Sequence, residues 1–416
     1  MTALGPARTL KEAYRFCDPM RPLNDPEWQA AFYVERSPDS RIDTLQASLE
    51  LDDAEDDKTI VSSQVGVGET TELYRLAQAL EETHEIIFFD VVASLNLGDI
   101  HYTDLLVQLG LTVYQAARRR GIPADESQAE GLRFWYEQHE LIEAGAWQLE
   151  SGAEIDLALV RFTARLSEEK PFRHQVRATA EAHLSDLLER LNGLLEHLRA
   201  RFGRRLLVIV DGLDKVFDLE LAAKLLLHGA NALLAPTCRM IYTVPFPLFY
   251  SDDFQQVRHQ FHRTYLLPCV KVREQDGAPY RPGRDMLTNV VRRRVHSELI
   301  TDRALHDLVE GSGGIVRELL RLARLSIVAA RQRGATRVER QDVRWARREV
   351  RSTYRRLLTV EDYPHLWQVV ETKRIDRLPR EVSRKLLHNM SVLEYNGDTW
   401  WDVHPAVREL LEQSSA

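Results

Sequence analysis

Four short apolar runs, separated by long amphipathic segments, constrain the fold of this 416-residue chain most strongly. The runs are "TIVSS" (59–63), "EIIFFDVV" (85–92), "RLLVIVDGLDKV" (205–216) and "CRMIYTVP" (238–245). Continuous apolar runs of this kind are typical of strands that are covered on both faces. Helical patterns lie between them, such as leucines at i, i+3, i+4 and i+7 spacing over 184–198. Strands that alternate with helices predict an α/β fold with a parallel sheet.

The composition is that of a folded globular protein with two or three domains. Hydrophobic residues make up 44% of the chain and charged residues 28%, which does not favour wholesale disorder. The cysteines Cys17, Cys238 and Cys269 are far apart, so neither a disulfide framework nor a zinc site is predicted. The sequence shows no signal-peptide pattern and no apolar run of bilayer-spanning length, so we expect a cytoplasmic protein without a membrane segment.

Changes in composition divide the chain into expected domains. Residues 1–50 are rich in proline and aspartate and predict an arm, which precedes an α/β core at 51–275. Within this core, 121–171 is rich in Gly, Ala and Glu, and we expect an insertion that carries one helix at 132–147. A helical lid domain at 276–338 follows the core.

The last segment, 339–416, changes pattern again. It contains "LPREVSRKLLHNMSVLEYNGDTWWDVHPAVRELLEQ", which predicts helix, strand, turn, strand and helix in that order. Asn396 and Gly397, between two short aromatic-rich runs, are a strong hairpin signal. A helical unit closed by a hairpin predicts a winged-helix-like domain.

The stretch "VSSQVGVGETTEL" (61–73) connects the first apolar run to a helical pattern through a glycine turn. It has the form of a phosphate-binding loop, G-x-x-x-x-G-K-[ST], whose backbone amides and helix N-terminus bind phosphate. The candidate nucleotide-binding residues are Gly66, Val67, Gly68, Glu69, Thr70 and Thr71. Ser63 occupies the place of the first glycine, and Glu69 occupies the place of the lysine.

A second half of a nucleotide site is expected at the end of the third apolar run. Ligands of α/β proteins bind beyond the carboxyl ends of the strands, and Asp211 ends "VIVD". We therefore expect Asp211 and the Thr70 hydroxyl to hold Mg²⁺. Asp214, three residues later, is a candidate for orienting an attacking water. An aspartate at the end of an apolar strand is also common without any such role.

Two further polar groups fit the same site. Arg239 and Thr243 are expected near the end of the next strand, where Thr243 would sense the γ-phosphate. In "GSGGIVRELLRLAR" (311–324), Arg317 lies one turn into a helix that follows flexible glycines. Its guanidinium would report the third phosphate through planar, charge-assisted contacts. The alternative for Arg317 is an ordinary surface arginine.

The order of these motifs resembles the STAND branch of AAA+-related P-loop NTPases, over about residues 20–410. The resemblance rests on the glycine loop followed by "TEL", on "VIVDGLDK", on "GG-x-x-R" and on the C-terminal hairpin unit. It implies binding of ATP or ADP with Mg²⁺, and it implies that the arm lies near the adenine, with Tyr33 of "YVER" against the base. It also implies a nucleotide-controlled switch that serves antiphage defence or transcriptional signalling, through an effector subunit or a homo-oligomer.

Glu69 weakens the expected nucleotide site. Loss of the lysine forfeits a charged hydrogen bond worth about 1.5–3 kcal/mol. A carboxylate about 4 Å from a phosphate adds repulsion of about 4 kcal/mol at an effective dielectric constant of about 20. We therefore expect weak or absent ATP hydrolysis. Three explanations stay open: an introduced substitution that disables an ATPase, a natural decay that leaves a scaffold, and a turn that never bound phosphate.

Two other functions compete with the switch. One is a DNA-binding regulator, since residues 317–356 hold 13 arginines, no lysine and four acidic residues, a net charge of +9 within a chain of net charge −8. The other is a structural subunit that lends an inactive ATPase fold to an assembly. The expected hairpin carries Glu394, Asp398 and Asp402 but no cation, which favours a protein partner over nucleic acid. Its Trp400 and Trp401 fit either an interface or a core.

Overall fold

The computed structural model of the chain describes residues 4–36, 41–123, 126–142, 152–251, 254, 256, 258–395 and 399–414. Its internal contacts divide the chain into two compact units. We call residues 45–62 and 77–265 the sheet unit, and residues 1–44, 63–76 and 266–416 the loop unit. The glycine turn and the arm thus belong, by their contacts, with the C-terminal half of the chain.

A five-stranded parallel sheet of order β2-β3-β4-β1-β5 organises the sheet unit. The register pairs Ile87 with Val208 and Val208 with Met240, so the middle strands are buried side by side. The four apolar runs all form strands, which confirms the predicted α/β fold. The fifth strand has a short and partly polar sequence that gave no signal. The strands are β1 (Lys58–Ser63), β2 (His84–Asp90), β3 (Arg205–Asp211), β4 (Arg239–Pro245) and β5 (Arg263–Leu267).

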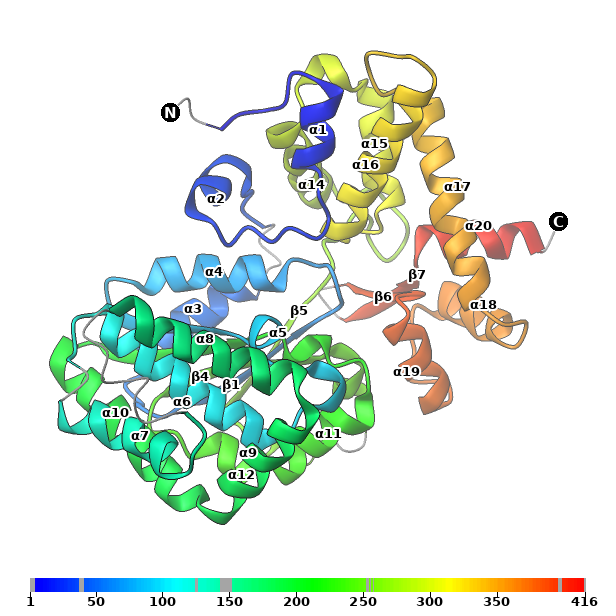
Figure 1. Cartoon of the computed structure of the whole chain (residues 1–416). Coiled ribbons are helices and arrows are strands. Elements are labelled where there is room, and N and C mark those ends of the chain that lie inside the picture. Colours follow the sequence, from blue (N-terminus) through cyan, green and yellow to red (C-terminus); the bar gives the residue numbers. More distant parts are fainter. Residues whose placement is uncertain are drawn as a thin grey trace. The chain divides into compact units, whose positions relative to one another are not determined.

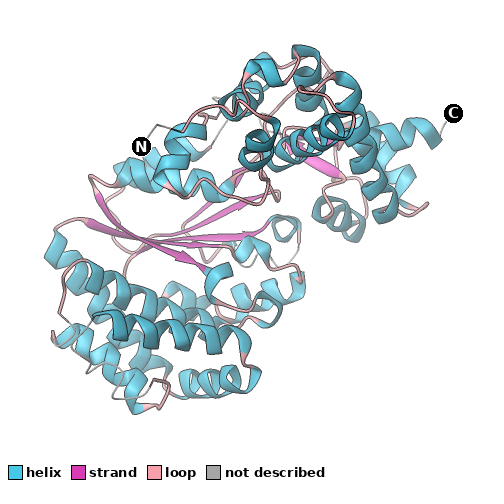
Figure 2. Cartoon of the chain, turned by 45° about the horizontal axis from the view of Figure 1, so that its top comes forward, coloured by secondary structure: helices cyan, strands magenta, loops and turns pink. Residues whose placement is uncertain are grey.

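Helices α6 to α12 gather on one side of this sheet (Figures 1 and 2). A single apolar core joins the strands to the leucine stripes of these helices, because each stripe presents its i, i+3, i+4 face to the same interior. The helical segments are α5 (Val91–Ser94), η1 (Leu97–Asp99), α6 (Tyr102–Arg119), α7 (Ser127–Gln138), α8 (Gly152–Glu168), α9 (Lys170–Ala182), α10 (Leu184–Phe202), η3 (Leu213–Lys215), α11 (Leu219–His228), α12 (Ala230–Leu234) and η4 (Phe246–Tyr250).

The expected insertion contains more helix than its composition suggested. The single helix expected at 132–147 is wrong in extent, because α7 ends at Gln138 and α8 and α9 follow; Trp147 lies outside the described residues. In α8, the buried residues Leu159, Phe162 and Leu166 have helical spacing. Alanine and charged residues between them obscured that period in the sequence.

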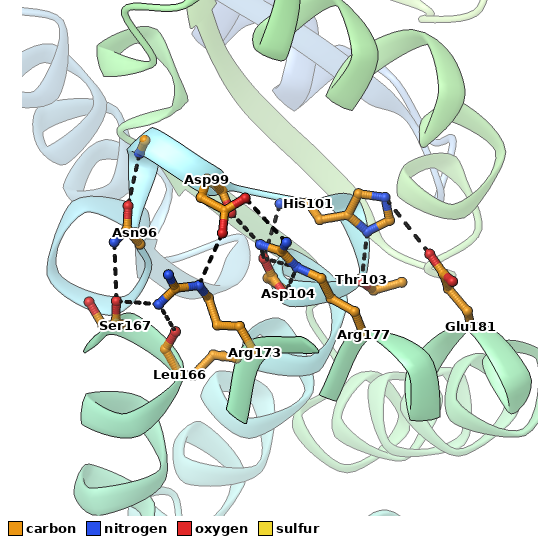
Figure 3. A network of polar contacts seen from close by, with 11 residues as sticks. Asn96, Asp99, His101, Thr103, Asp104, Leu166, Ser167, Arg173, Arg177 and Glu181 are labelled. Carbon is orange, nitrogen blue, oxygen red and sulfur yellow. Dashed lines mark hydrogen bonds and ion pairs between the residues drawn. The ribbon is translucent and has the colours of Figure 1, made fainter. Parts of the chain in front are cut away.

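An ion-pair network joins α9 to the start of α6 (Figure 3). Arg177 donates to both carboxylate oxygens of Asp104, at 2.7 and 3.0 Å for the shortest contact to each, and also pairs with Asp99. Arg173 pairs with Asp99 and donates to the carbonyl of Ser167 in α8. Asp104 also accepts the amide of His101 and so caps α6. We call Arg173, Arg177, Asp99 and Asp104 the Arg177 cluster.

The loop unit combines the arm, the glycine turn and the C-terminal helices. The helix α3 (Ile42–Leu51) begins in this unit and ends in the sheet unit, and α4 begins here as well. The remaining helical segments are α1 (Leu10–Phe16), α2 (Pro26–Phe32), α4 (Glu69–Leu80), α14 (Arg281–Arg294), η5 (Ser297–Leu299), α15 (Asp302–Gly311), α16 (Val316–Gln332), α17 (Arg340–Leu357), α18 (Asp362–Thr372), α19 (Arg380–His388) and α20 (Pro405–Ser414).

The arm is packed against the C-terminal helices of its own unit. Asp18 pairs with Arg324 of α16 at 2.9 Å. Arg294 of α14 donates to the carbonyl of Phe32 at 3.1 Å, and the Ala7 amide donates to the Arg294 carbonyl at 2.9 Å. The arm is therefore an integral layer of the loop unit.

The predicted C-terminal order of helix, strand, strand and helix is confirmed. Strands β6 (Val392–Tyr395) and β7 (Trp400–Val403) pair antiparallel, while the predicted turn at 396–398 lies outside the described residues. Trp400 is buried and stacks on Tyr395 with ring centroids 4.6 Å apart, so it belongs to a core. Among the described residues, no helix has both the length and the apolar content needed to cross a bilayer.

Candidate phosphate-binding loop

The glycine loop (residues 64–68) joins β1 to α4 and depends on both of its glycines. Gly66 has φ +89° and Gly68 has φ +109°, a backbone conformation that residues with a side chain rarely adopt. A Cβ at Gly66 would lie 2.7 Å from the Cβ of Arg317, whereas a Cβ at Gly68 would meet nothing within 4 Å. The two positions therefore differ: Gly66 is packed against α16, and Gly68 borders open space.

Two arginines hold the carbonyl groups of the loop. The Arg317 backbone amide donates to the Gly66 carbonyl at 2.9 Å. The Arg36 Nη1 donates to the Val67 carbonyl at 3.1 Å, and its Nη2 donates to the Pro268 carbonyl at 2.7 Å. Because the Val67–Gly68 peptide is planar and trans, the Gly68 N–H points away from Arg36. Within the described part of the chain, no backbone carbonyl accepts this N–H.

The side chain of Val67 anchors the loop in an apolar cluster. Val67 is 1% exposed, so the valine is part of a core rather than of a surface turn. Burial of this side chain holds the middle of the loop in place. The other members of the cluster are Leu267, Cys269, Ile315, Leu393, Tyr395 and Trp400.

Gln64 connects the loop to the C-terminal hairpin. Its Nε2 donates to the Val392 carbonyl at 2.8 Å, and its Oε1 accepts the Glu394 amide at 2.8 Å. The Cys269 thiol also donates to this Oε1, at 3.3 Å. The amide side chain thus pairs with β6 as a neighbouring strand would. Sequence analysis missed Gln64, because its partners lie about 330 positions away and leave no local signal.

The first turn of α4 carries the other loop candidates and meets the arm. Glu69 is its first residue, and Thr71 Oγ1 accepts the Leu23 amide at 3.4 Å. The Tyr33 hydroxyl donates to Glu72 at 3.3 Å. Burial raises the pKa of Glu72, and the cations Arg36 and Arg75 oppose that shift. The loop unit by itself therefore brings Arg36 and Arg317 to the loop and Tyr33 to the first turn of α4. Arg36 belongs to "YVER", but nothing in the sequence indicated its contact with the loop.

In the sheet unit, the Thr243 side chain of β4 contacts Asp214 in the turn that follows β3. The Thr243 hydroxyl accepts the amides of Gly212 and Leu213 at 3.0 and 3.1 Å, and it donates to Asp214 Oδ1 at 3.3 Å. The hydroxyl thus fixes the turn that follows β3. Asp211 is the last residue of β3 and is buried.

The expected position of Arg239 is wrong. It is the first residue of β4, at the amino end of the strand, and therefore at the opposite sheet edge from a γ-phosphate sensor. Its guanidinium donates to backbone carbonyls of Leu49, Asp52 and Ala54. Arg239 therefore binds the segment 49–54 to the amino end of β4.

The predicted site residues divide between the two units. Residues 66–71, Tyr33 and Arg317 belong to the loop unit, while Asp211, Asp214 and Thr243 belong to the sheet unit. β1 and β3 are strands of one parallel sheet, and β1 continues directly into the glycine loop. The pairing of Thr70 with Asp211 around Mg²⁺ stays a prediction.

Comparison with known proteins gives distant structural similarities only. No family model matches the chain, and no curated protein matches its sequence. The Orc2 protein of Aeropyrum pernix, in complexes with ADPNP and ADP, is similar with 13% identity over 93% of this chain and 98% of that chain, at a TM-score of 0.44. Cdc6p of Pyrobaculum aerophilum is similar with 13% identity over 93% of this chain and 98% of that chain, at a TM-score of 0.39. A Walker-type ATPase of Pyrococcus abyssi is similar with 17% identity over 95% of this chain and 99% of that chain, at a TM-score of 0.44.

Proposed function

We propose that the chain is a P-loop nucleotide-binding protein that works as a nucleotide-controlled switch of the STAND type. One observation carries this proposal: the glycine loop holds its carbonyls in protein contacts and turns the Gly68 amide away from them, beside open space. Amides turned to one side of a glycine loop at a helix N-terminus are the donors that phosphate requires.

The donor set suits ATP or ADP with Mg²⁺. The amides at Gly68 and the start of α4 would hold phosphate, and Arg317 would reach the terminal phosphate. Thr70 and Asp211 would supply the hydroxyl and carboxylate oxygens that Mg²⁺ prefers. The metal would neutralise phosphate charge, and Asp214 would orient water. Tyr33 would lie near the base.

Glu69 makes a switch more fitting than a motor. The loop keeps its backbone donors but carries a carboxylate where a phosphate-binding lysine is usual. Binding would therefore be weak and turnover slow, so occupancy of the loop would follow the nucleotide concentration and would not be ended by hydrolysis. A protein effector, or a second copy of the chain, would receive that signal, and antiphage defence is the setting that the resemblance to STAND proteins suggests.

The contacts of the loop support a switch, because they run to three other parts of the loop unit. Arg36 comes from the arm, Arg317 from α16, and Gln64 reaches β6 of the hairpin. A phosphate that changes the loop would therefore alter the seating of the hairpin as well.

A nucleic-acid role is the second candidate, supported by one face of α17. Arg344 and Arg348, one helical turn apart, are exposed there. The acidic hairpin also counts less against it than the sequence suggested, since Glu394 is buried and Asp402 pairs with Lys373 and Arg408. Duplex DNA binding that weakens steeply with salt would support this candidate.

Hydrogen exchange of the Glu69→Lys chain, with and without Mg²⁺ and ADP or ATP, tests the switch. We expect nucleotide to change exchange in the loop and also in peptides that contain β6. The Gln64→Leu substitution, added to Glu69→Lys, should keep the change in the loop and abolish the change in β6. Binding without any effect on β6 would leave a nucleotide-binding protein without this switch, and absence of binding would overturn the proposal.

A further inference from the structure

We propose that Arg36 is the positioning residue of the glycine loop: it holds the Val67 carbonyl and thereby turns the Gly68 amide toward phosphate. The inference rests on the proposed nucleotide-binding function and explains how a loop without its lysine keeps a phosphate-binding form. The lysine of a usual loop acts on the phosphate itself, whereas Arg36 acts on the protein backbone behind it.

The contacts of Arg36 require a forked side chain. Its two terminal nitrogens donate to carbonyls of Val67 and Pro268, which belong to chain segments about 200 residues apart. A guanidinium holds two terminal donor nitrogens at a fixed separation in one rigid plane, while the donors of an ammonium all diverge from a single nitrogen. Arg36 thus ties the loop to the segment that follows β5.

The loop needs such an anchor because of its glycines. The Val67–Gly68 peptide ends at Gly68, and Gly66 lies one residue before Val67. Both glycines have positive φ. Glycine adopts positive and negative φ about equally readily, so this peptide can rotate at little cost unless its carbonyl is held. Rotation would turn the Gly68 N–H to the other side and place a carbonyl where phosphate is expected.

The charge around Arg36 fits a role at an anion site. Its guanidinium donates to the neutral carbonyls of Val67 and Pro268, and the strongest opposite charge that acts on it is that of Glu72, which also binds Tyr33 and Arg75. Burial lowers the pKa of Arg36, and the charge of Glu72 opposes that shift. The negative charge of Glu72 is therefore shared among Arg36, Arg75 and the Tyr33 hydroxyl.

Substitution of Arg36 in the full-length chain tests the inference with two measurements. The first is hydrogen exchange of residues 63–72 without nucleotide; the second is the affinity of the Glu69→Lys chain for ADP with Mg²⁺. Arg36→Met should speed exchange and lower affinity, each by about tenfold or more, the change that about 1.4 kcal/mol produces. Arg36→Lys keeps the charge but not the fork, and it should lose nearly as much.

Arg21 provides the matched control. It is another arginine of the arm, and its guanidinium lies 3.5 Å from the ring centroid of Trp28, away from the loop contacts described above. Arg21→Met should leave loop exchange and nucleotide affinity unchanged. Thermal unfolding of each variant checks that it is folded, and if Arg36→Met is not, Arg36→Gln keeps one donor and serves in its place.

The outcomes separate this inference from the proposed function. Unchanged loop exchange in the Arg36 variants, or full retention of affinity by Arg36→Lys, would overturn the positioning role even if nucleotide binds. Faster exchange in Arg36→Met, with no nucleotide binding by any chain, would keep Arg36 as the residue that sets the loop and would reject the phosphate site.

Discussion

The Arg177 cluster of the sheet unit and the Arg36 contacts of the loop unit are two ways of placing an arginine inside a protein. Arg177 pairs with the carboxylates of Asp104 and Asp99, and Arg36 donates to two backbone carbonyls. Burial lowers the pKa of Arg177, but the hydrogen bonds and charges of its acidic partners outweigh burial and raise the pKa overall. For Arg36 burial prevails, and the pKa is lowered.

This difference separates a structural contact from a contact that can respond to a ligand. In the Arg177 cluster each charged side chain pairs with one of opposite charge. In the loop unit, two buried ionisable groups have neutral hydrogen-bond partners: Arg36 donates to carbonyls, and Glu394 lies beside the Trp401 indole. The loop unit should therefore depend more on pH and on bound anions than the sheet unit.

The largest expected effect on stability is in the Arg177 cluster. Arg177→Met would leave the buried carboxylate of Asp104 without its cation, and we expect the free energy of unfolding to fall by about 3–5 kcal/mol. Arg199→Met is the control, because Arg199 pairs with exposed Glu55 and such pairs contribute about 1 kcal/mol or less. Denaturant unfolding measures both. A small effect of Arg177→Met would show that the pairing of Arg177 with Asp104 does not stabilise the fold.

Glu394 makes the loop unit less stable as the pH rises from acid to neutral. Burial raises its pKa from 4.5 to about 8, and Trp401 and Arg41 only partly oppose this shift. Because the folded-state pKa lies above the unfolded one, stability is highest in acid, falls as the pH rises from about 4.5 through about 8, and is level above that. Glu394→Gln cannot ionise, so it should be more stable than the native chain at pH 9, by a few kcal/mol, and similar at pH 5.

Unfolding curves of the two chains across this pH range test the prediction. Glu381→Gln, on the exposed surface of α19, should follow the native chain at every pH. Parallel curves for the native and Glu394→Gln chains would contradict the assigned origin of the pH dependence.

The contact between Gln64 and β6 should have a smaller effect. Gln64→Leu leaves the Val392 carbonyl and the Glu394 amide without their partner, at a cost of about 1–3 kcal/mol. Hydrogen exchange at β6 should rise accordingly. Gln341→Leu, at an exposed position on α17, should have no such effect. If β6 keeps its protection in Gln64→Leu, the loop and the hairpin are not coupled through this side chain.

The sequence predicted the framework better than the contacts that set the loop. Each long apolar run became a strand, and the leucine pattern over 184–198 lies within α10. These features depend on local periodicity, which a single sequence displays. Arg239 precedes the apolar residues of its run, so it lies at the amino end of β4, and only Thr243 lies toward the carboxyl end.

The contacts of the loop depend on distant parts of the chain. Gln64 finds its partners in β6 and Arg36 finds one after β5, and no spacing within the sequence indicates either pairing. The nucleotide-binding roles of Tyr33, Thr70, Asp211, Asp214, Thr243 and Arg317 stay predictions.

Calorimetric titration of ATP with Mg²⁺ into the native and Glu69→Lys chains tests the phosphate-binding role of the loop most directly. The Lys variant should bind about a hundredfold more tightly or more, because it regains a charged hydrogen bond and loses a repulsion. Glu82→Lys, the same change at an exposed position after α4, should leave the affinity unchanged. Equal affinity in the native and Glu69→Lys chains, or no binding by either, would contradict a phosphate site at the glycine loop.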